Sequence, residues 1–398
     1  MKKLHSIQFA SYIICLLSGV FLFSSCQKDE NIEPDLINNR TVLVYILGNN
    51  SLSYNANTDL SELVAAARNN PLKGTLLCFF DDNQPGATLY KIDQKGKSVI
   101  KEYPAGYKTA TPEAIKEVMN IAKSEYPAPG YGLVLWSHGS GWLPSNAYSF
   151  MRTKFRSPNY PLVKNASEDS KAFGQDGSDW LELGEIKSSL NDHELDFLIF
   201  DACYMGEIEV FYELKDKTDF IIGSPAEILS DGFPYEKVTP LFFEKSPAIK
   251  DIASTYFEHY NSKTGWMRSA TITAVNTRYL GLLAEAVKSI YSVRYSELQN
   301  LPVSSMQYFD RYNRHTMFDL GQIIRMISPD NYPEVVNIFN QAIVYKNATP
   351  VMFENNGQFL INPENYSGFS SYIPYVGYTD LNMLYLNTDW GKYLFTNQ

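Results

Sequence analysis

Residues 196–206 read DFLIFDACYMG, and this stretch decides the fold class that the sequence predicts. Four apolar residues, Phe197 to Phe200, are followed by Asp201 and then by Cys203. A short apolar run bounded by polar residues is typical of a strand that is buried on both faces of a sheet. A cysteine placed just past such a strand lies where open α/β sheets gather their ligand-binding and catalytic groups.

Strands and helices alternate on both sides of this stretch, which predicts an α/β fold. The expected sheet is parallel or mixed and is covered by helices on both faces. Apolar runs predict strands at 41–47, 74–80, 131–136, 195–201, 220–224 and 269–276, and a hairpin at 89–103. Helical periodicity predicts helices at 57–68, 111–126, 183–190, 207–216 and 248–260, an irregular segment at 144–179, and a mostly helical chain from 278 to 366.

The first 25 residues have the pattern of an export signal. Lys2 and Lys3 precede an apolar stretch at 9–23, and small residues lead up to Cys26. This pattern resembles a bacterial lipoprotein signal, in which cleavage leaves Cys26 as the lipidated N-terminus. An ordinary secretory signal cut nearby and an uncleaved anchor are the alternatives. The acidic residues at 28–30 resemble a surface-export tag, so we expect attachment to the bacterial outer membrane with exposure at the cell surface.

The composition narrows the range of partners. The chain has 398 residues, 44% hydrophobic content and a net charge of −10, which becomes −12 when residues 1–25 are removed with Lys2 and Lys3. A chain of this length can bury a large core. The negative charge argues against nucleic acid and anionic membrane surfaces as partners. We therefore expect membrane contact through the N-terminal lipid only, and a monomer.

The cysteines single out one residue for function. Cys15 belongs to the signal and Cys26 would carry lipid, which leaves Cys78 and Cys203 as thiols of the mature protein. Exported proteins tend to oxidise or omit free thiols, so each of these two needs a reason. Cys78 lies in the middle of a predicted strand and is interpreted as a small core residue. Cys203 lies at a strand end and is the candidate nucleophile.

His138 occupies the same kind of place as Cys203. It follows the apolar run 133–136, and if the two strands are neighbours its imidazole and the thiol project into one crevice. His138 could then protonate the leaving amine or take the thiol proton. The backbone N–H groups of Gly139 and Cys203 are the expected oxyanion hole. A helix expected to begin near Met205 or Gly206 would favour the thiolate.

The stretches LVLWSHGSGW at 133–142 and FLIFDACYMG at 197–206 resemble the clostripain-like family of cysteine peptidases, within the group that includes caspases, legumains and gingipains. A softer similarity covers most of the mature chain, including SGFSSYIP at 367–374. The resemblance implies a caspase-like sheet and endopeptidase activity through a dyad of His138 and Cys203. It also implies cleavage after basic residues, activation by self-cleavage, and calcium as a candidate cofactor; the residues themselves indicate no cofactor and no metal site.

With this resemblance the chain divides into four expected parts. These are a signal peptide at 1–25, a flexible tether at 26–39, a caspase-like peptidase domain at 40–277 and a smaller, mainly helical C-terminal subdomain at 278–398. Self-cleavage is expected between 144 and 179, because long exposed loops are where proteolytic nicks concentrate. The preferred positions are Arg152, Lys154 and Arg156.

Three acidic residues are candidates for binding a basic substrate side chain. Residues two apart in an extended strand face the same side, so Asp201 is expected to share the crevice with Cys203. A carboxylate there would select Arg or Lys, because burying either cation without a counter-charge is costly. The alternative role for Asp201 is a cap that accepts N–H bonds from the following turn. Glu227 and Asp231 replace Asp201 if the next strand lines the pocket.

Two other classes of function compete with the peptidase. The first is a catalytically silent surface lipoprotein of the same fold that binds protein or glycan. The second is a thiol redox protein, which we discount because the sequence lacks C-x-x-C. The stretch DGSDW at 176–180 lacks the ligand spacing of a calcium loop and predicts a solvated turn.

Overall fold

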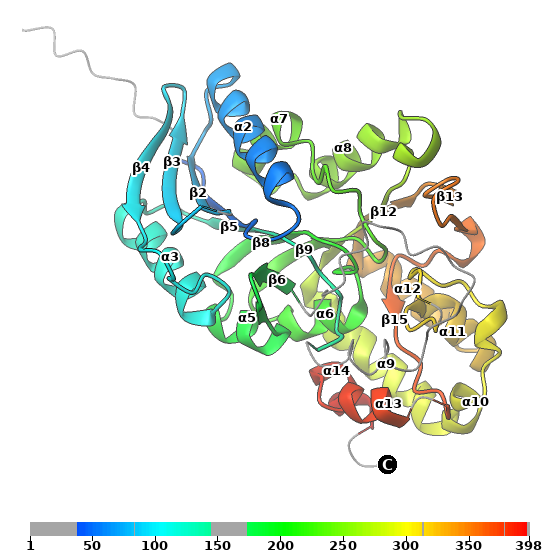
Figure 1. The fold of residues 1–398 in the computed structure, drawn as a ribbon. Coiled ribbons are helices and arrows are strands. Elements are labelled where there is room, and N and C mark those ends of the chain that lie inside the picture. The colour runs from blue at the N-terminus through cyan, green and yellow to red at the C-terminus, as the bar shows by residue number, and fades with distance from the viewer. Residues whose placement is uncertain (1–37, 83, 145–172, 313, 378, 396–398) are drawn as a thin grey trace, which may run out of the picture. The chain divides into compact units, whose positions relative to one another are not determined.

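A computed structural model describes residues 38–82, 84–144, 173–312, 314–377 and 379–395. Its main feature is a nine-stranded sheet in the order β12-β10-β9-β8-β5-β1-β2-β3-β4 (Figure 1). These strands are β1 Thr41–Leu47, β2 Thr75–Asp81, β3 Thr88–Asp93, β4 Gly96–Glu102, β5 Tyr131–Trp136, β8 Leu195–Asp201, β9 Thr218–Gly223, β10 Thr271–Asn276 and β12 Ile343–Ala348. Shorter strands pair outside this sheet: β6 Phe173–Asp176 with β7 Asp179–Leu181, β11 Phe318–Asp319 with β15 Ser370–Ser371, and β13 Val351–Met352 with β14 Phe359–Leu360.

The centre of the sheet is parallel and its two edges are antiparallel. Strands β2, β1, β5, β8 and β9 run parallel, whereas β3 and β4 on one side and β10 and β12 on the other pair antiparallel. The side chains of β1 are all at most 1% exposed, which explains why this strand is apolar throughout. The prediction of an α/β fold with a mostly parallel central sheet is confirmed.

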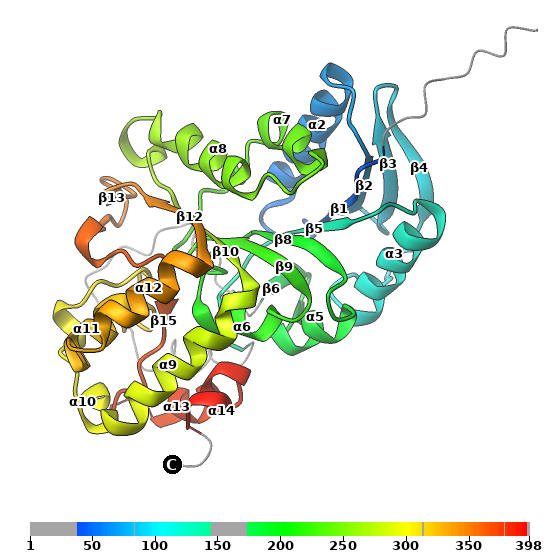
Figure 2. The same cartoon turned by 180° about the vertical axis from the view of Figure 1, so that it is seen from behind.

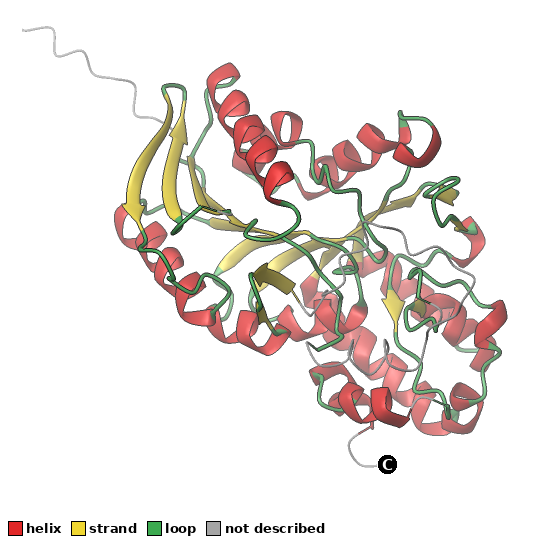
Figure 3. Cartoon of the chain, in the orientation of Figure 1, coloured by secondary structure: helices red, strands yellow, loops and turns green. Residues whose placement is uncertain are grey.

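Helices cover both faces of the sheet. Figures 1 and 2 show α2, α7 and α8 on one face and α3, α5 and α6 on the other, and Figure 3 shows the alternation of strands and helices along the chain. The helices are α2 Ser53–Asn69, α3 Pro112–Glu125, α5 Leu183–Ser189, α6 Ile208–Leu214, α7 Tyr235–Val238, α8 Ile249–Asn261, α9 Leu280–Val293, α10 Tyr295–Gln299, α11 Leu320–Ile327, α12 Tyr332–Ala342, α13 Thr379–Tyr385 and α14 Asp389–Phe395.

Most predicted elements occur within a few residues of their expected bounds. The helix expected from Thr111 is confirmed: Thr111 caps α3 by accepting the N–H of Ala114 at 3.2 Å. Several short elements were missed, and two differences bear on the site and the sheet. Residues 173–181 form the β6–β7 hairpin instead of continuing the irregular segment, and β12 extends the main sheet from within the region expected to be mostly helical. Strand β12 lies at the edge of the sheet and is only partly buried, and its sequence IVYKNA has no continuous apolar run.

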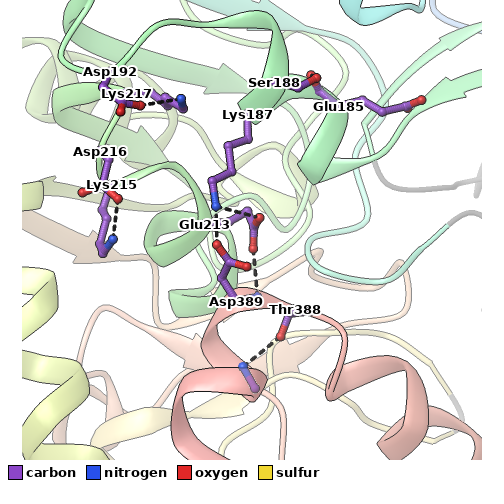
Figure 4. Close-up of polar contacts among 11 residues, drawn as sticks. Glu185, Lys187, Ser188, Asp192, Glu213, Lys215, Asp216, Lys217, Thr388 and Asp389 are labelled. Atoms are coloured by element: carbon purple, nitrogen blue, oxygen red, sulfur yellow. Dashed lines mark hydrogen bonds and ion pairs between the residues drawn. The ribbon is translucent and has the colours of Figure 1, made fainter. Parts of the chain in front are cut away.

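The C-terminal part is attached to α6, the helix that follows Cys203. Lys187 of α5 forms ion pairs with Glu213 of α6 and Asp389 of α14, and the N–H of Asp389 donates to Glu213 Oε2 at 3.0 Å (Figure 4). A buried carboxylate adds to this attachment. Glu209 Oε1 accepts hydrogen bonds from Ser371 Oγ, from the N–H of Tyr372 and from Tyr385 Oη.

The C-terminal residues therefore support the element behind the candidate nucleophile. The domain boundary predicted between 277 and 278 stays a prediction, and β10 and β12 on its two sides belong to one sheet. Residues 1–37, which include the predicted signal and Cys26, lie outside the described part of the chain. Within the described ranges, no helix combines the length and apolar character needed to cross a membrane.

Candidate active site

Four loops meet at the carboxyl edge of the parallel strands. They follow β1, β5, β8 and β9 and comprise residues 48–52, 137–143, 202–206 and 224–234. Strands β5 and β8 are direct neighbours, with Trp136 opposite Asp201, so His138 and Cys203 lie on adjacent loops. A Cβ added at Gly139 would lie 2.6 Å from the carbonyl oxygen of Cys203, so this close approach requires glycine.

The loop that carries Cys203 is paired with the loop that follows β9. Its backbone forms two hydrogen bonds to that loop, Tyr204 N to Ala226 O at 3.0 Å and Gly206 N to Ser224 O at 2.7 Å. Two residues after Ala226, the N–H of Ile228 donates in the opposite direction, to the Sγ of Cys203, at 3.5 Å. Tyr204 has a φ of 64°, in the left-handed region that is costly for a bulky residue. These contacts hold the half-buried thiol in one position.

The imidazole of His138 is held from the loop that follows β1. Its Nε2 lies 2.9 Å from Ser51 Oγ, and its ring centre lies 6.4 Å from that of Trp180. The preceding residue, Ser137, donates its hydroxyl to the carbonyl of Leu47 at 2.9 Å. With Nε2 engaged by Ser51, Nδ1 is the nitrogen left to exchange protons with reacting groups.

Burial keeps the candidate dyad uncharged in this state. Burial lowers the pKa of His138 to about 4 and raises the pKa of Cys203 to about 12. This corrects the expected effect of a helix N-terminus on the thiol. Helix α6 begins at Ile208, later than the expected Met205 or Gly206, and has only seven residues, so burial dominates. With both groups uncharged, the imidazole is able to accept a proton from the thiol.

Asp201 is buried at the end of β8. Its side chain is 2% exposed, and its Oδ2 accepts hydrogen bonds from the N–H of Phe233 at 3.0 Å and from Tyr235 Oη at 2.9 Å. The prediction that Asp201 and Cys203 share one crevice stays a prediction; β8 ends at Asp201, and Cys203 follows in a turn. Through the N–H of Phe233, Asp201 supports the loop 224–234. This role is similar to the alternative considered for it, a carboxylate that accepts N–H bonds from a turn.

A second buried carboxyl group lies near Asp201. Asp59 of α2 is 1% exposed and accepts a hydrogen bond from Trp136 Nε1 at 2.7 Å. Burial raises the pKa of both carboxyl groups, and the charge of Asp201 raises the pKa of Asp59 further. The folded protein therefore retains protons on this pair at pH values where an unfolded chain has released them.

This pair predicts a fall in stability as the pH rises. Above the ordinary carboxyl pKa the folded state binds more protons than the unfolded state, so the free energy of unfolding decreases by up to about 1.4 kcal/mol per pH unit for each retained proton. Urea unfolding between pH 5 and pH 9 measures this slope. Other buried acids with raised pKa values, such as Glu207 and Glu209, contribute to the same slope, so Asp59→Asn should reduce it in part. The exposed Asp330→Asn should leave it unchanged, and an unchanged slope in Asp59→Asn would contradict the assignment.

The other two candidate acids lie on the loop 224–234 and differ in their surroundings. The carboxylate of Glu227 accepts two hydrogen bonds from the guanidinium of Arg311, at 2.5 and 2.7 Å, so an internal cation already neutralises it. Asp231 is exposed, and its Oδ1 accepts one hydrogen bond, of 3.3 Å, from Asn55 Nδ2. Asp231 follows Ile228, which contacts the thiol, by three residues. Glu227 and Asp231 lie on the same loop, which contacts Cys203 through Ile228. Among Asp201, Glu227 and Asp231, only Asp231 is exposed.

The remaining predicted residues have simpler environments. Cys78 is completely buried in β2, so its interpretation as a core residue is confirmed. Asp176 in the DGSDW stretch accepts hydrogen bonds from Asn49 Nδ2 at 2.7 Å and from the N–H of Thr109 at 3.2 Å, and so links loops of the protein. Over the described ranges, no group of three or more His, Cys, Asp or Glu side chains could hold a metal ion. Arg152, Lys154 and Arg156 lie outside the described residues.

Sequence analysis missed four residues of the site. They are Ser51 beside His138, Trp180 beside the same ring, Ile228 beside the thiol, and Arg311 on Glu227. Three of them come from loops or hairpins far along the chain from the residue that they contact. A serine, an isoleucine and an arginine also have no type-specific signal, because each occurs mostly in other roles.

Comparisons with known proteins agree with this geometry. A model of the clostripain family matches residues 44–394. Clostripain of Hathewaya histolytica is 26% identical over 231 residues, which cover 54% of this chain and 40% of clostripain, so the match spans less than half of that relative.

Solved structures of similar proteins match over more of the chain. The structure of an inactive zymogen C11 protease from Parabacteroides distasonis has a TM-score of 0.77 and 29% identity, covering 90% of this chain and 98% of that one. The structure of a secreted C11 cysteine protease from Bacteroides thetaiotaomicron, in complex with an irreversible peptide inhibitor, has a TM-score of 0.72 and 28% identity, covering 90% and 100%. These likenesses confirm the expected fold.

Proposed function

The chain belongs to the clostripain family, and from that membership we propose that it is a cysteine endopeptidase that hydrolyses peptide bonds through His138 and Cys203. The observation that carries the proposal is the position of these two residues on adjacent loops at the carboxyl edge of neighbouring parallel strands. The similar protease from B. thetaiotaomicron, which binds an irreversible peptide inhibitor, supports peptides as the substrate class.

The proposed mechanism starts from the neutral dyad. The Sγ of Cys203 attacks the carbonyl carbon of the scissile bond while His138 takes the thiol proton. The N–H groups of Gly139 and Cys203 stabilise the negative charge that develops on the carbonyl oxygen. His138 then returns the proton to the leaving amine, which leaves a thioester on Cys203. Water, deprotonated by His138, hydrolyses the thioester and restores the thiol.

The competing proposal is a binding lipoprotein of the same fold. It predicts that Cys203 does not react selectively with thiol-directed electrophiles, whereas the peptidase predicts selective labelling. Cleavage profiling of a peptide library with the protein and with Cys203→Ala separates the two. Products formed by the wild type alone support the peptidase, and the absence of products with correctly processed wild type would favour binding.

We propose further that cleavage occurs after Arg or Lys and that Asp231 provides the counter-charge. Asp201 is buried against protein groups and Glu227 is paired with Arg311, whereas Asp231 is exposed on the loop that contacts Cys203. An exposed carboxylate can pair with an incoming cation at a smaller desolvation cost than a buried one. Arg should be at least as good a substrate as Lys, because its planar guanidinium can donate two hydrogen bonds to a carboxylate.

Activation by self-cleavage between residues 144 and 179 is a separate part of the proposal. The similar protease from P. distasonis is described as an inactive zymogen, which supports a precursor form. We expect purified wild type to become two chains, with cleavage after Arg152, Lys154 or Arg156. Mass spectrometry of the fragments locates the cut. Cys203→Ala should stay a single chain, and an active wild type that stays intact would show that self-processing is not required.

Export and anchoring complete the proposal. The similar B. thetaiotaomicron protease is secreted, which supports export of this chain. We propose that Cys26 carries the lipid that attaches the protein to the outer membrane, with protein or peptide substrates as its other partners and calcium as a cofactor to be tested. Mass spectrometry of the mature N-terminus tests the anchor, because an unmodified residue there would contradict it.

A further inference from the structure

A carboxylate lies next to the contact that holds the candidate nucleophile. The N–H of Ile228 donates to Cys203 Sγ at 3.5 Å, and Glu227 precedes Ile228 in the chain. An N–H that donates to sulfur stabilises a thiolate, whereas a negative charge close by opposes it. The loop therefore brings one favourable and one unfavourable group to the same sulfur. Something must offset the carboxylate if Sγ is to become negative during attack.

Arg311 is the cation that meets this carboxylate. Its guanidinium donates to both oxygens of Glu227, at 2.5 and 2.7 Å, and the two side chains are only 17% and 20% exposed. The same group stacks over the ring of Phe353 at 4.3 Å and donates to the carbonyl of Asn356 at 2.9 Å. The guanidinium of Arg311 forms a planar, two-point pair with Glu227 and is held by two further contacts, so it has little freedom to move away from that carboxylate.

Asp310, the residue before Arg311, is held by several hydrogen bonds. The fully buried Asp310 accepts hydrogen bonds from the N–H groups of Tyr312, Thr316 and Met317, and its Oδ1 lies 2.8 Å from His315 Nδ1. The ring of Tyr312 lies 5.8 Å from that of Tyr204, the residue after the nucleophile. Arg311 is thus held in place with respect to the loop that bears Cys203.

We propose that Arg311 is a positioning residue for the nucleophile: it neutralises Glu227 beside Cys203 and thereby allows negative charge to form on Sγ. The inference rests on the proposed role of Cys203 and explains why a carboxylate can lie so close to that thiol. Glu227 then acts as the anchor of the loop that presents the Ile228 N–H, rather than as a group that binds substrate.

The charges around Sγ come from several elements. Glu227 on the loop after β9 and Asp201 at the end of β8 oppose the thiolate, whereas Arg311 favours it. Tyr256 of α8 is close enough to interact with the thiol and remains protonated, because burial raises its pKa well above its ordinary value. His138 on the loop after β5 is neutral in this state. Arg311 is thus the cation that favours the thiolate in this set.

The experiment is a charge cycle read out by alkylation. The rate of reaction of Cys203 with iodoacetamide is measured from pH 6 to pH 10 in a Cys78→Ala background, with Arg311→Met, Glu227→Gln and the double variant Arg311→Met/Glu227→Gln. We expect Arg311→Met to slow alkylation about tenfold throughout this pH range, because Glu227 is left unpaired and raises the pKa of the thiol. Glu227→Gln alone should react at least as fast as the parent.

The double variant decides the proposal. If Arg311 acts by neutralising Glu227, removing both charges should return the rate to within about threefold of the parent. If the double variant is as slow as Arg311→Met, or if Arg311→Met reacts like the parent, the proposal is wrong. Arg311→Lys, which keeps the charge without the two-point geometry, should fall between the parent and Arg311→Met.

Two features keep this result separate from the proposed peptidase function. Alkylation by a small electrophile needs no peptide turnover, so the cycle can succeed even if the protein cleaves nothing. Thermal unfolding of each variant checks the fold. A loosened site would expose the thiol and speed alkylation at all pH values, which is the opposite of the slowing expected for Arg311→Met.

Discussion

Cys203→Ala should abolish peptide cleavage and reduce kcat by at least about a thousandfold. The reason is that no other thiol on the four loops of the candidate active site can form the thioester intermediate of the proposed mechanism. The side chain is only half-buried, and the change removes a single sulfur atom, so the protein should remain folded. His138→Ala should cause a loss of similar size, since the thiol proton then has no acceptor and the amine no donor. Steady-state cleavage of a peptide with a basic residue before the scissile bond measures both effects.

The matched control is the other thiol of the mature protein. Cys78 is completely buried in the middle of β2, so Cys78→Ala should lower stability slightly and leave turnover within about twofold of the wild type. Circular dichroism of all three variants checks the fold. Full activity in folded Cys203→Ala would end the peptidase assignment. If only His138→Ala keeps full activity, Cys203 remains the proposed nucleophile and another residue must act as the base.

Asp231→Asn should reduce kcat/KM about fivefold for peptides with Arg or Lys before the scissile bond and change it little for peptides with Gln or Leu. The reason is that an ion pair between an exposed carboxylate and the substrate cation contributes up to about 1 kcal/mol. Four matched peptides that differ only at that residue measure the effect. The ratio of basic to neutral cleavage is the quantity to compare.

Asp201→Asn is the control that separates binding from support. Because Asp201 accepts hydrogen bonds beneath the loop 224–234, its replacement should lower cleavage of all four peptides together and reduce stability. If Asp201→Asn loses activity toward the basic peptides alone, Asp201 rather than Asp231 provides the counter-charge for the substrate cation. If the wild type prefers Leu or Gln, the basic preference implied by the family does not apply to this chain.

The sequence predicted the parts of the site that depend on strand ends. His138 and Cys203 each follow an apolar run, and the side chains of parallel strands buried on both faces must be apolar, so the end of such a run marks the edge of the sheet. Gly139 was predicted for its N–H group, and the structure adds that its backbone passes so close to Cys203 that a Cβ has no room. The family resemblance of these two stretches then implied their chemistry.

Other contacts of the site could not be predicted, because the residues that make them are distant in the sequence. Asp201 lies two residues from Cys203, yet the strand ends between them, and its partners Phe233 and Tyr235 come from more than thirty residues away. The charge state of the thiol depends on burial and on Arg311, which is contributed by a loop more than one hundred residues later. Strand β12 was missed for a similar reason, since its pairing with β10 defines it more than its own composition does.

The amino-acid sequence by itself determined the α/β class, the alternation of elements, and the two positions at which a thiol and an imidazole reach the sheet edge. These follow from local periodicity, because burial on both faces of a strand leaves a continuous apolar run. Tertiary structure alone decided which acid is buried, which is paired and which is exposed: Asp201, Glu227 and Asp231 are alike in charge and lie within 31 residues of one another. Their roles differ because the energy of a carboxylate depends on the water, N–H groups and cations around it, and chain segments far apart in sequence supply those surroundings only after folding.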